Sequence, residues 1–176
     1  AGLAKKNNPD CLVVAGGPNI DVTPKNRKAY LKLNDFVDLA VAYDGEIPFL
    51  EIIKRRLDGA TVKDLRRNPP VGTHCLHPDT LEYVESKLPA PRLTSINVFG
   101  PIYTSGVFDK FLDANYYPLL ETVRGCPFHC AYCHASDPYY SKLFFLSPEI
   151  FQQAMEYLGQ RFANRPEIIL HIVNAN

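Results

Sequence analysis

Three cysteines lie close together in the second half of the chain. Cys126, Cys130 and Cys133 stand in a C-x3-C-x2-C spacing within residues 123–134. Thiolates bind zinc and iron–sulfur clusters, and four of them complete a structural zinc site or a four-iron cluster. Three thiolates leave one coordination position without sulfur, and an open position lets a metal centre bind a small molecule. The spacing therefore predicts a metal centre with room for a small ligand.

The residues around the cysteines suit such a loop and also leave alternatives open. Gly125 is expected to let the backbone approach the centre closely, because it carries no side chain. One alternative is a zinc site that adds His134 to the three cysteines, although structural zinc sites use separated ligand pairs rather than neighbours such as Cys133 and His134. Another is that the cysteines are only small buried residues.

At these residues the sequence resembles the radical S-adenosylmethionine (SAM) enzymes. Their loop reads C-x3-C-x-aromatic-C, and Tyr132 supplies the aromatic residue here. The resemblance implies a four-iron four-sulfur cluster held by the three thiolates, with SAM on the remaining iron. It also implies reductive cleavage of SAM to a 5′-deoxyadenosyl radical, with Tyr132 beside the adenine and Phe128 as a further SAM contact.

The first sixty residues alternate between strand and helix patterns. Apolar runs at 11–15 and 37–43 predict buried strands, and a Thr23-Pro24 start and the stretch 46–57 predict helices. We expect Phe49, Ile52, Ile53 and Leu57 to lie on one face of the second helix. This order indicates α/β architecture with a doubly wound parallel sheet, whose ligands lie beyond the carboxyl ends of the strands.

This order of strands and helices, with the turns that follow the two strands, resembles the second half of the cobalamin-binding domain that precedes many radical SAM domains. The matching motifs are Gly-Gly-Pro after the first strand and Val37-Asp38…Gly45-Glu46 around the second. The resemblance implies a Rossmann-like domain that contacts cobalamin. The residues it assigns to cobalamin are Gly16, Gly17, Pro18, Gly45 and Glu46.

The chain is expected to contain parts of two domains. Residues 1–60 are interpreted as the C-terminal half of a cobalamin-binding domain, and 61–115, rich in proline, as an interdomain linker with a helix at 80–88. Residues 116–176 are interpreted as the start of a radical SAM domain, a partial (β/α) TIM-like barrel. It would contain a strand at 116–123, a helix from Ser147-Pro148 to about Phe162 and a strand at 167–173. We expect the chain to be a piece of a longer protein.

The segment after this last strand departs from the family pattern. Cobalamin-dependent relatives often carry two aspartates and an asparagine there, whereas this chain has Asn174-Ala175-Asn176. Asn174 is expected to accept a hydrogen bond from SAM, more weakly than a carboxylate would.

Charge and hydropathy argue against some classes of binding partner. The formal net charge is zero, which argues against a surface devoted to nucleic acid or anionic membrane. No apolar run reaches the roughly 20 residues that span a bilayer. Crowded cysteines intended for iron suit a reducing cytoplasm. The expected partners are a small-molecule or peptide substrate and an electron donor such as flavodoxin or ferredoxin.

The sequence thus predicts a cobalamin-dependent radical SAM enzyme, most simply a methyltransferase acting on an unactivated carbon. Two alternatives stay open: a radical SAM enzyme without cobalamin, such as a methylthiotransferase-like protein, and a zinc-stabilised binding module without catalysis.

Overall fold

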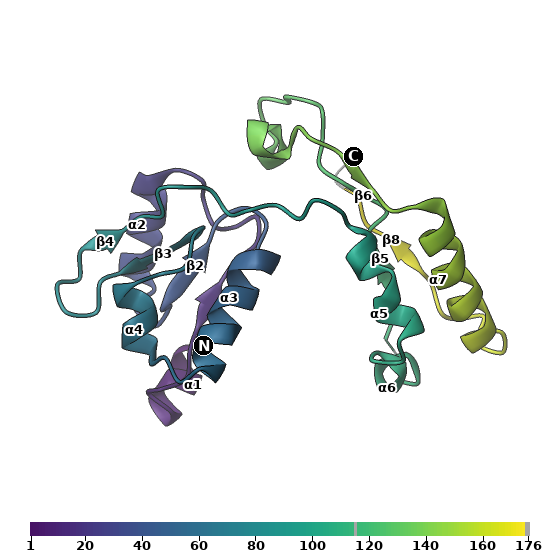
Figure 1. Cartoon of the computed structure of the whole chain (residues 1–176), viewed down its shortest axis with the longest axis horizontal. Helices are drawn as coiled ribbons and strands as arrows, with labels where there is room; N and C mark the ends of the chain where they lie inside the picture. The colour runs from purple at the N-terminus through teal and green to yellow at the C-terminus, as the bar shows by residue number, and fades with distance from the viewer. Residues whose placement is uncertain (115, 175–176) are drawn as a thin grey trace. The chain divides into compact units, whose positions relative to one another are not determined.

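The chain divides into two compact units, Ala1–Leu93 and Thr94–Asn176 (Figure 1). A computed structural model describes residues 1–114 and 116–174, so Ala175 and Asn176 of the predicted end segment lie outside the described residues. The predicted segment 61–115 contributes to both units, because its residues up to Leu93 pack with the first. The functional assignment of the predicted domains stays a prediction.

The first unit is a small sheet with helices on both faces. Its elements are α1 (Gly2–Asn7), β1 (Val14–Ala15), α2 (Pro24–Leu33), β2 (Leu39–Val41), α3 (Glu46–Leu57), α4 (Val62–Arg67), β3 (Thr73–Leu76) and β4 (Tyr83–Val84). The strands lie in the order β1-β2-β3-β4. Strand β1 pairs with β2 in parallel, Val14 opposite Leu39, whereas β3 is antiparallel to both β2 and β4.

Alternate residues of the central strand enter two separate cores. Ala40 and Ala42 pack with Leu31 of α2 on one face. Leu39 packs with Ile52 of α3 and Leu65 of α4 on the other. This follows from the two-residue repeat of a strand, and the run 39–42 is fully apolar because both faces are covered. The α/β class is thereby confirmed. A doubly wound parallel sheet is not established, because in the sheet of the first unit β1 and β2 are parallel whereas β3 is antiparallel to its two neighbours.

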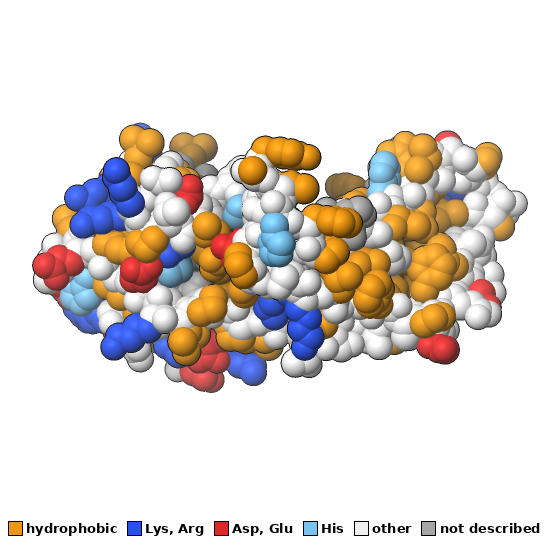
Figure 2. Space-filling model, turned by 90° about the horizontal axis from the view of Figure 1, so that it is seen from above, with side chains coloured by type: hydrophobic (Ala, Val, Ile, Leu, Met, Phe, Trp, Pro, Cys, Tyr) orange, Lys and Arg blue, Asp and Glu red, His pale blue; other side chains and the backbone are white. Residues whose placement is uncertain are grey.

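The helix expected at 80–88 was wrong. Residues 80–88 do not form a helix; they contain β4, which pairs with β3 after a turn in which the N–H of His77 donates to the carbonyl of Glu82. The apolar face of α3 is covered only in part. Ile52 is fully buried, but Phe49 and Leu57 are 49% and 82% exposed. Hydrophobic side chains are common at the surface, as the orange areas of Figure 2 show.

The second unit packs short strands against one long helix. It contains η1 (Asn97–Phe99), α5 (Pro101–Thr104), α6 (Asp109–Leu112), β5 (Leu119–Leu120), β6 (Val123–Arg124), η2 (His134–Ser136), η3 (Pro138–Tyr140), β7 (Phe144–Phe145), α7 (Pro148–Arg161) and β8 (His171–Ile172). Strand β5 pairs in parallel with β8, and β6 pairs antiparallel with β7. Helix α7 begins as predicted, with the Ser147 hydroxyl accepting from the Ile150 N–H.

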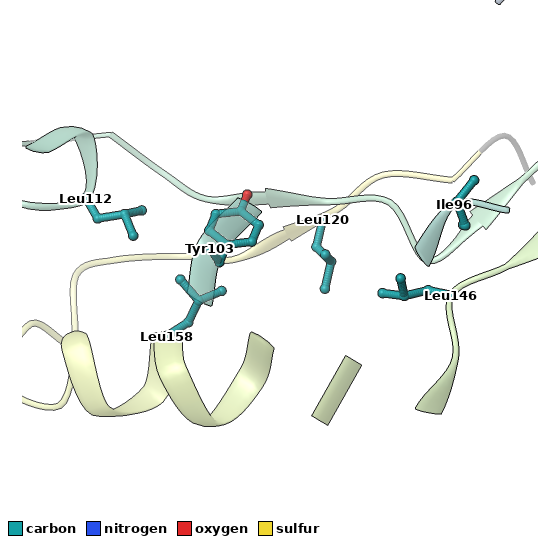
Figure 3. Packing of buried hydrophobic residues seen from close by; sticks show 6 residues of the cluster. All are labelled: Ile96, Tyr103, Leu112, Leu120, Leu146 and Leu158. Carbon is teal, nitrogen blue, oxygen red and sulfur yellow. The ribbon is translucent and has the colours of Figure 1, made fainter. Parts of the chain in front are cut away.

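The core of this unit lies between the strands and α7. Leu120 of β5 and Leu158 of α7 point into the same layer, beside Tyr103 of α5 (Figure 3). The Tyr103 hydroxyl donates to the carbonyl of Leu119 and accepts from its N–H, so one side chain satisfies an edge of β5. The strand–loop–helix–strand order of the partial barrel is present, but closure into a barrel is not shown. None of the helices in the described part of the chain combines the length and apolar character needed to cross a membrane.

Candidate functional site

The cysteine loop connects the paired strands β6 and β7. Arg124 lies opposite Phe144 in the ladder, and the N–H of Cys126 continues it by donating to the carbonyl of Tyr140 over 2.9 Å. Both ends of the loop are therefore fixed on neighbouring strands. This anchor could not be predicted from the sequence, because it is made by a backbone carbonyl of Tyr140 that any residue would carry.

Gly125 is required by this hairpin. Its φ is +101°, and a Cβ there would lie 2.4 Å from the carbonyl oxygen of Lys142 and 2.8 Å from that of Tyr140. Only glycine allows both the positive φ and the close approach of two backbones. The close approach seen at Gly125 is to the segment 140–142 that returns from the loop, and the approach to a metal centre expected there stays a prediction.

The three cysteines occupy different environments within the loop. Cys126 is buried, Cys130 half-buried and Cys133 exposed, and all three thiols are free. The N–H of Cys133 donates to the carbonyl of Cys130 over 3.0 Å, so these two residues share one turn. Within residues 1–114 and 116–174, no three His, Cys, Asp or Glu side chains gather as a metal site, and this includes the zinc set with His134. The three thiols belong to one loop but are not brought around a common point, and their role as ligands stays a prediction.

By donor chemistry the loop fits an iron–sulfur cluster. Three free thiols within eight residues, none consumed by a disulfide, can all supply thiolates. The imidazole of His134 instead lies 3.4 Å from the Tyr140 hydroxyl, with the two rings 5.6 Å apart.

Two aromatic rings of the loop face solvent. Tyr132 is 94% exposed and Phe128 is 60% exposed. Exposed rings beside a prospective metal centre offer flat apolar surfaces to a nucleotide base. The structure does not test either residue as a SAM contact.

Asn174 has a role that the sequence did not indicate. Its side-chain oxygen accepts from the N–H groups of Thr122 and Val123 and from the Thr122 hydroxyl, over 3.0–3.1 Å. The acceptor expected to meet SAM is thus engaged within the chain. Thr122 was not singled out from the sequence, since 52 residues separate it from its partner.

The glycine turns lie together at one edge of the first unit's sheet. Strands β1 and β2 are parallel neighbours, so the turns that follow them meet at the same edge. A Cβ at Gly16 would lie 3.8 Å from the Val41 carbonyl, and one at Gly45 would lie 3.9 Å from the Val41 side chain. Gly17 and Pro18 follow in the first turn, and Glu46 begins α3.

The same edge carries features that sequence reasoning missed. Tyr43, just after β2, has φ +69°, which is uncommon outside glycine. Asp44 accepts from Arg92 over 3.0 Å, with both side chains nearly buried. This ion pair ties the second turn to a residue 48 positions away, a distance over which sequence spacing gives no signal.

Comparison with known proteins adds an independent line of evidence. The chain is 32% identical over 166 residues to the 2-(S-pantetheinyl)-carbapenam-3-carboxylate methyltransferase of Streptantibioticus cattleyicolor, covering 91% of this chain and 23% of that enzyme. It is 30% identical over 182 residues to the cobalamin-dependent radical SAM methyltransferase TokK of Streptomyces tokunonensis, covering 100% of this chain and 25% of TokK. An uncharacterized methyltransferase of Pyrococcus horikoshii is 28% identical over 138 residues, covering 77% of this chain and 28% of that protein.

The chain is related to methyltransferases. It spans about a quarter of the length of the relatives it matches. No protein-family model matches it. The activity of the whole protein is therefore a matter for proposal.

Proposed function

We propose that the chain is part of a cobalamin-dependent radical SAM methyltransferase that methylates an unactivated carbon. The observation that carries this is the similarity to TokK, because it covers 100% of the chain and so includes both the glycine turns and the cysteine loop. We further propose a Rossmann-like first domain and a barrel-type second domain. The parallel β1–β2 and β5–β8 pairs support them.

The cysteine loop has the ligands for the proposed cluster. Cys126, Cys130 and Cys133 would hold it as thiolates, and Tyr132 and Phe128 would offer ring faces to the adenine. When bound, the cluster and corrinoid supply an electron to cleave SAM and a methyl group to transfer. The chain's own contribution is ligation and orientation, with Gly125 and the Tyr140 carbonyl fixing where Cys126 stands.

The edge of the first sheet is the proposed corrinoid contact. Gly16, Gly17 and Pro18 form the first turn, and Gly45 and Glu46 the second. Turns with little side chain allow a flat ligand to approach the backbone closely. Their position beyond the carboxyl ends of parallel strands is where ligands of open α/β sheets bind.

The partners are proposed from the chemistry. Reductive cleavage of SAM needs a one-electron donor, which we propose is a flavodoxin or a ferredoxin. The substrate is proposed to be a small molecule or a peptide, and the setting a reducing cytoplasm that keeps the loop thiols available.

Metal analysis after anaerobic purification tests the proposal. We expect iron and acid-labile sulfide in the wild type, and loss of both when Cys126, Cys130 or Cys133 is replaced by serine. Cys11→Ser is the matched control, because Cys11 is a half-buried free thiol of the first unit, and it should retain the iron.

Three results would count against the proposal. Zinc without iron or sulfide would support the binding module instead. Iron retained in Cys130→Ser would remove that residue from the ligand set. Iron and sulfide without corrinoid absorbance in the reconstituted protein would limit the assignment to a radical SAM enzyme that does not use cobalamin.

A further inference from the structure

The segment that leads to the cysteine loop changes its strand partner just before the loop. Residues 119–120 pair with β8, and the N–H of Val173 donates to the carbonyl of Leu120 over 3.0 Å as the last bond of that ladder. Residues 123–124 pair with β7. Between them, the carbonyl of Thr122 accepts from the N–H of Leu146 over 2.9 Å. Backbone groups at such a change of partner lose the acceptor that the ladder would have supplied.

The side chain of Asn174 supplies that acceptor. Its Oδ1 lies 3.1 Å from the N–H nitrogen of Thr122, 3.0 Å from that of Val123 and 3.1 Å from the Thr122 hydroxyl. Two backbone N–H groups can only donate, so the atom facing them must be the oxygen of the amide and not its nitrogen. Asn174 thus continues the β5–β8 ladder through its side chain.

This arrangement leaves Asn174 unsuited to the role that the family resemblance implied. The amino group of SAM offers N–H donors and so needs an acceptor, whereas the part of the Asn174 side-chain amide that is not engaged is an NH2, which only donates. The oxygen already serves three donors of the chain.

We propose that Asn174 is a positioning residue that fixes the strand delivering Cys126, an inference that rests on the proposed cluster-binding function of the loop. Val123 stands three residues before Cys126, and the N–H of Cys126 is itself bonded to Tyr140. The Asn174 contact holds the strand where it leaves β8, and the Tyr140 contact holds it where the loop begins. The backbone that leads to the first of the three cysteines is therefore held at two points.

Hydrogen exchange in the iron-free, SAM-free protein tests this directly. Asn174→Ala removes the acceptor, and we expect the Thr122 and Val123 amides to exchange about tenfold faster. The thiol of Cys126, a residue that is only 7% exposed, should also react faster with a thiol reagent, as measured on its labelled peptide. Asn174→Asp keeps an acceptor for both N–H groups and should restore wild-type exchange.

A matched control separates position from residue type. The Asn8 side-chain oxygen accepts from the N–H of Asp10 in an exposed turn of the first unit, so Asn8→Ala also removes an asparagine–backbone bond. It should leave exchange at Thr122 and Val123 unchanged. Unchanged exchange in Asn174→Ala, or failure of Asn174→Asp to restore it, would overturn the inference.

The outcome is independent of whether the wild type binds iron. Faster exchange in Asn174→Ala together with a wild type that holds no iron would support the positioning role and refute the proposed function. Unaltered exchange in Asn174→Ala together with a wild type that holds iron and sulfide would refute the positioning role and support the proposed function. In a protein that binds iron, Asn174→Ala should lower the iron content and Asn174→Asp should restore it.

Discussion

Replacing Gly125 with alanine tests how the hairpin holds the cysteine loop. The residue has φ +101°, and the added Cβ would lie 2.4 Å from the Lys142 carbonyl oxygen and 2.8 Å from that of Tyr140. Both atoms belong to the backbone, so they cannot rotate away as the end of a flexible side chain would. The two strands must separate, or the backbone at residue 125 must change conformation.

The cost follows from two contributions. A left-handed backbone costs an L-residue about 1–2 kcal/mol. Separation of the strands breaks the 2.9 Å bond from the Cys126 N–H to the Tyr140 carbonyl, which contributes about 1 kcal/mol. Gly125→Ala should therefore lower the free energy of unfolding of the second unit by about 2–3 kcal/mol.

Gly106→Ala is the matched control in the same unit. Gly106 also has a positive φ, +77°, but its added Cβ would meet only the Asp109 side chain, at an ordinary 3.5 Å. Urea unfolding followed by circular dichroism should show a loss of about 1–2 kcal/mol for this variant. Hydrogen exchange at the Cys126 amide should rise in Gly125→Ala alone. Equal losses in the two variants, or an unaltered Cys126 amide, would refute the steric reasoning.

Two further predictions concern buried polar groups of the first unit. Burial, and then the nearby Arg27, lower the pKa of His74 from 6.5 to about 4. Because the unfolded chain takes up this proton first, the contribution of His74 to the free energy of unfolding is complete above pH 6.5 and falls by roughly 3 kcal/mol towards pH 4. Removing it in His74→Gln should flatten the pH dependence measured by urea unfolding over that interval. The Asp38 carboxylate, 2% exposed, accepts from Lys5 and from the Val13 N–H over 2.8 Å each, so Asp38→Ala should lower the free energy of unfolding by about 3 kcal/mol.

The controls for these two predictions use the same unit. Glu51→Ala removes a carboxylate paired with Arg55 at the surface, where an ion pair contributes about 0–1 kcal/mol. A loss in Asp38→Ala as small as in Glu51→Ala would contradict the role assigned to burial. For His74, parallel wild-type and variant curves between pH 6.5 and 4 would show that its proton uptake is not linked to unfolding.

The elements that the sequence predicted well are those defined by local signals. Helix α2 begins at Pro24 after Thr23, α3 begins after the Asp44-Gly45 turn, and α7 begins at Pro148 after Ser147. In each case the start is set by residues adjacent in the chain, so no knowledge of the tertiary structure is needed. The cap at Thr23 differs in detail, since its hydroxyl donates to Asp21 rather than accepting from the helix.

The elements that failed depend on distant partners. Residues 80–88 carry no strong helix start, and Tyr83 and Val84 gain a strand partner in β3, which sequence periodicity over so short a stretch cannot reveal. The exposed Phe49 and Leu57 of α3 show a second limit of prediction from sequence. An apolar stripe predicts which side of a helix avoids water, but not whether the described chain supplies anything to cover it.

In the candidate site, too, local features could be predicted from the sequence and contacts between distant residues could not. That three thiols share one loop follows from their spacing alone. What fixes the loop does not, because Asn174 reaches Thr122 across 52 residues and Gly125 faces Lys142 through a backbone contact. The departure at Asn174 from the family pattern was visible in the sequence, and the structure shows which hydrogen bonds accompany it.

These contacts also determine how the three thiols can come together. Cys126 is buried and tied to Tyr140, whereas the Cys130–Cys133 turn is held by its own 3.0 Å bond and lies largely in solvent. If the loop holds the proposed cluster, Cys130 and Cys133 can move together relative to Cys126, because they share one hydrogen-bonded turn. Fixing one ligand in advance leaves less conformational entropy to be lost when a metal centre binds. For this reason the residues that hold Cys126, namely Gly125 and Asn174, should influence metal binding without being ligands themselves.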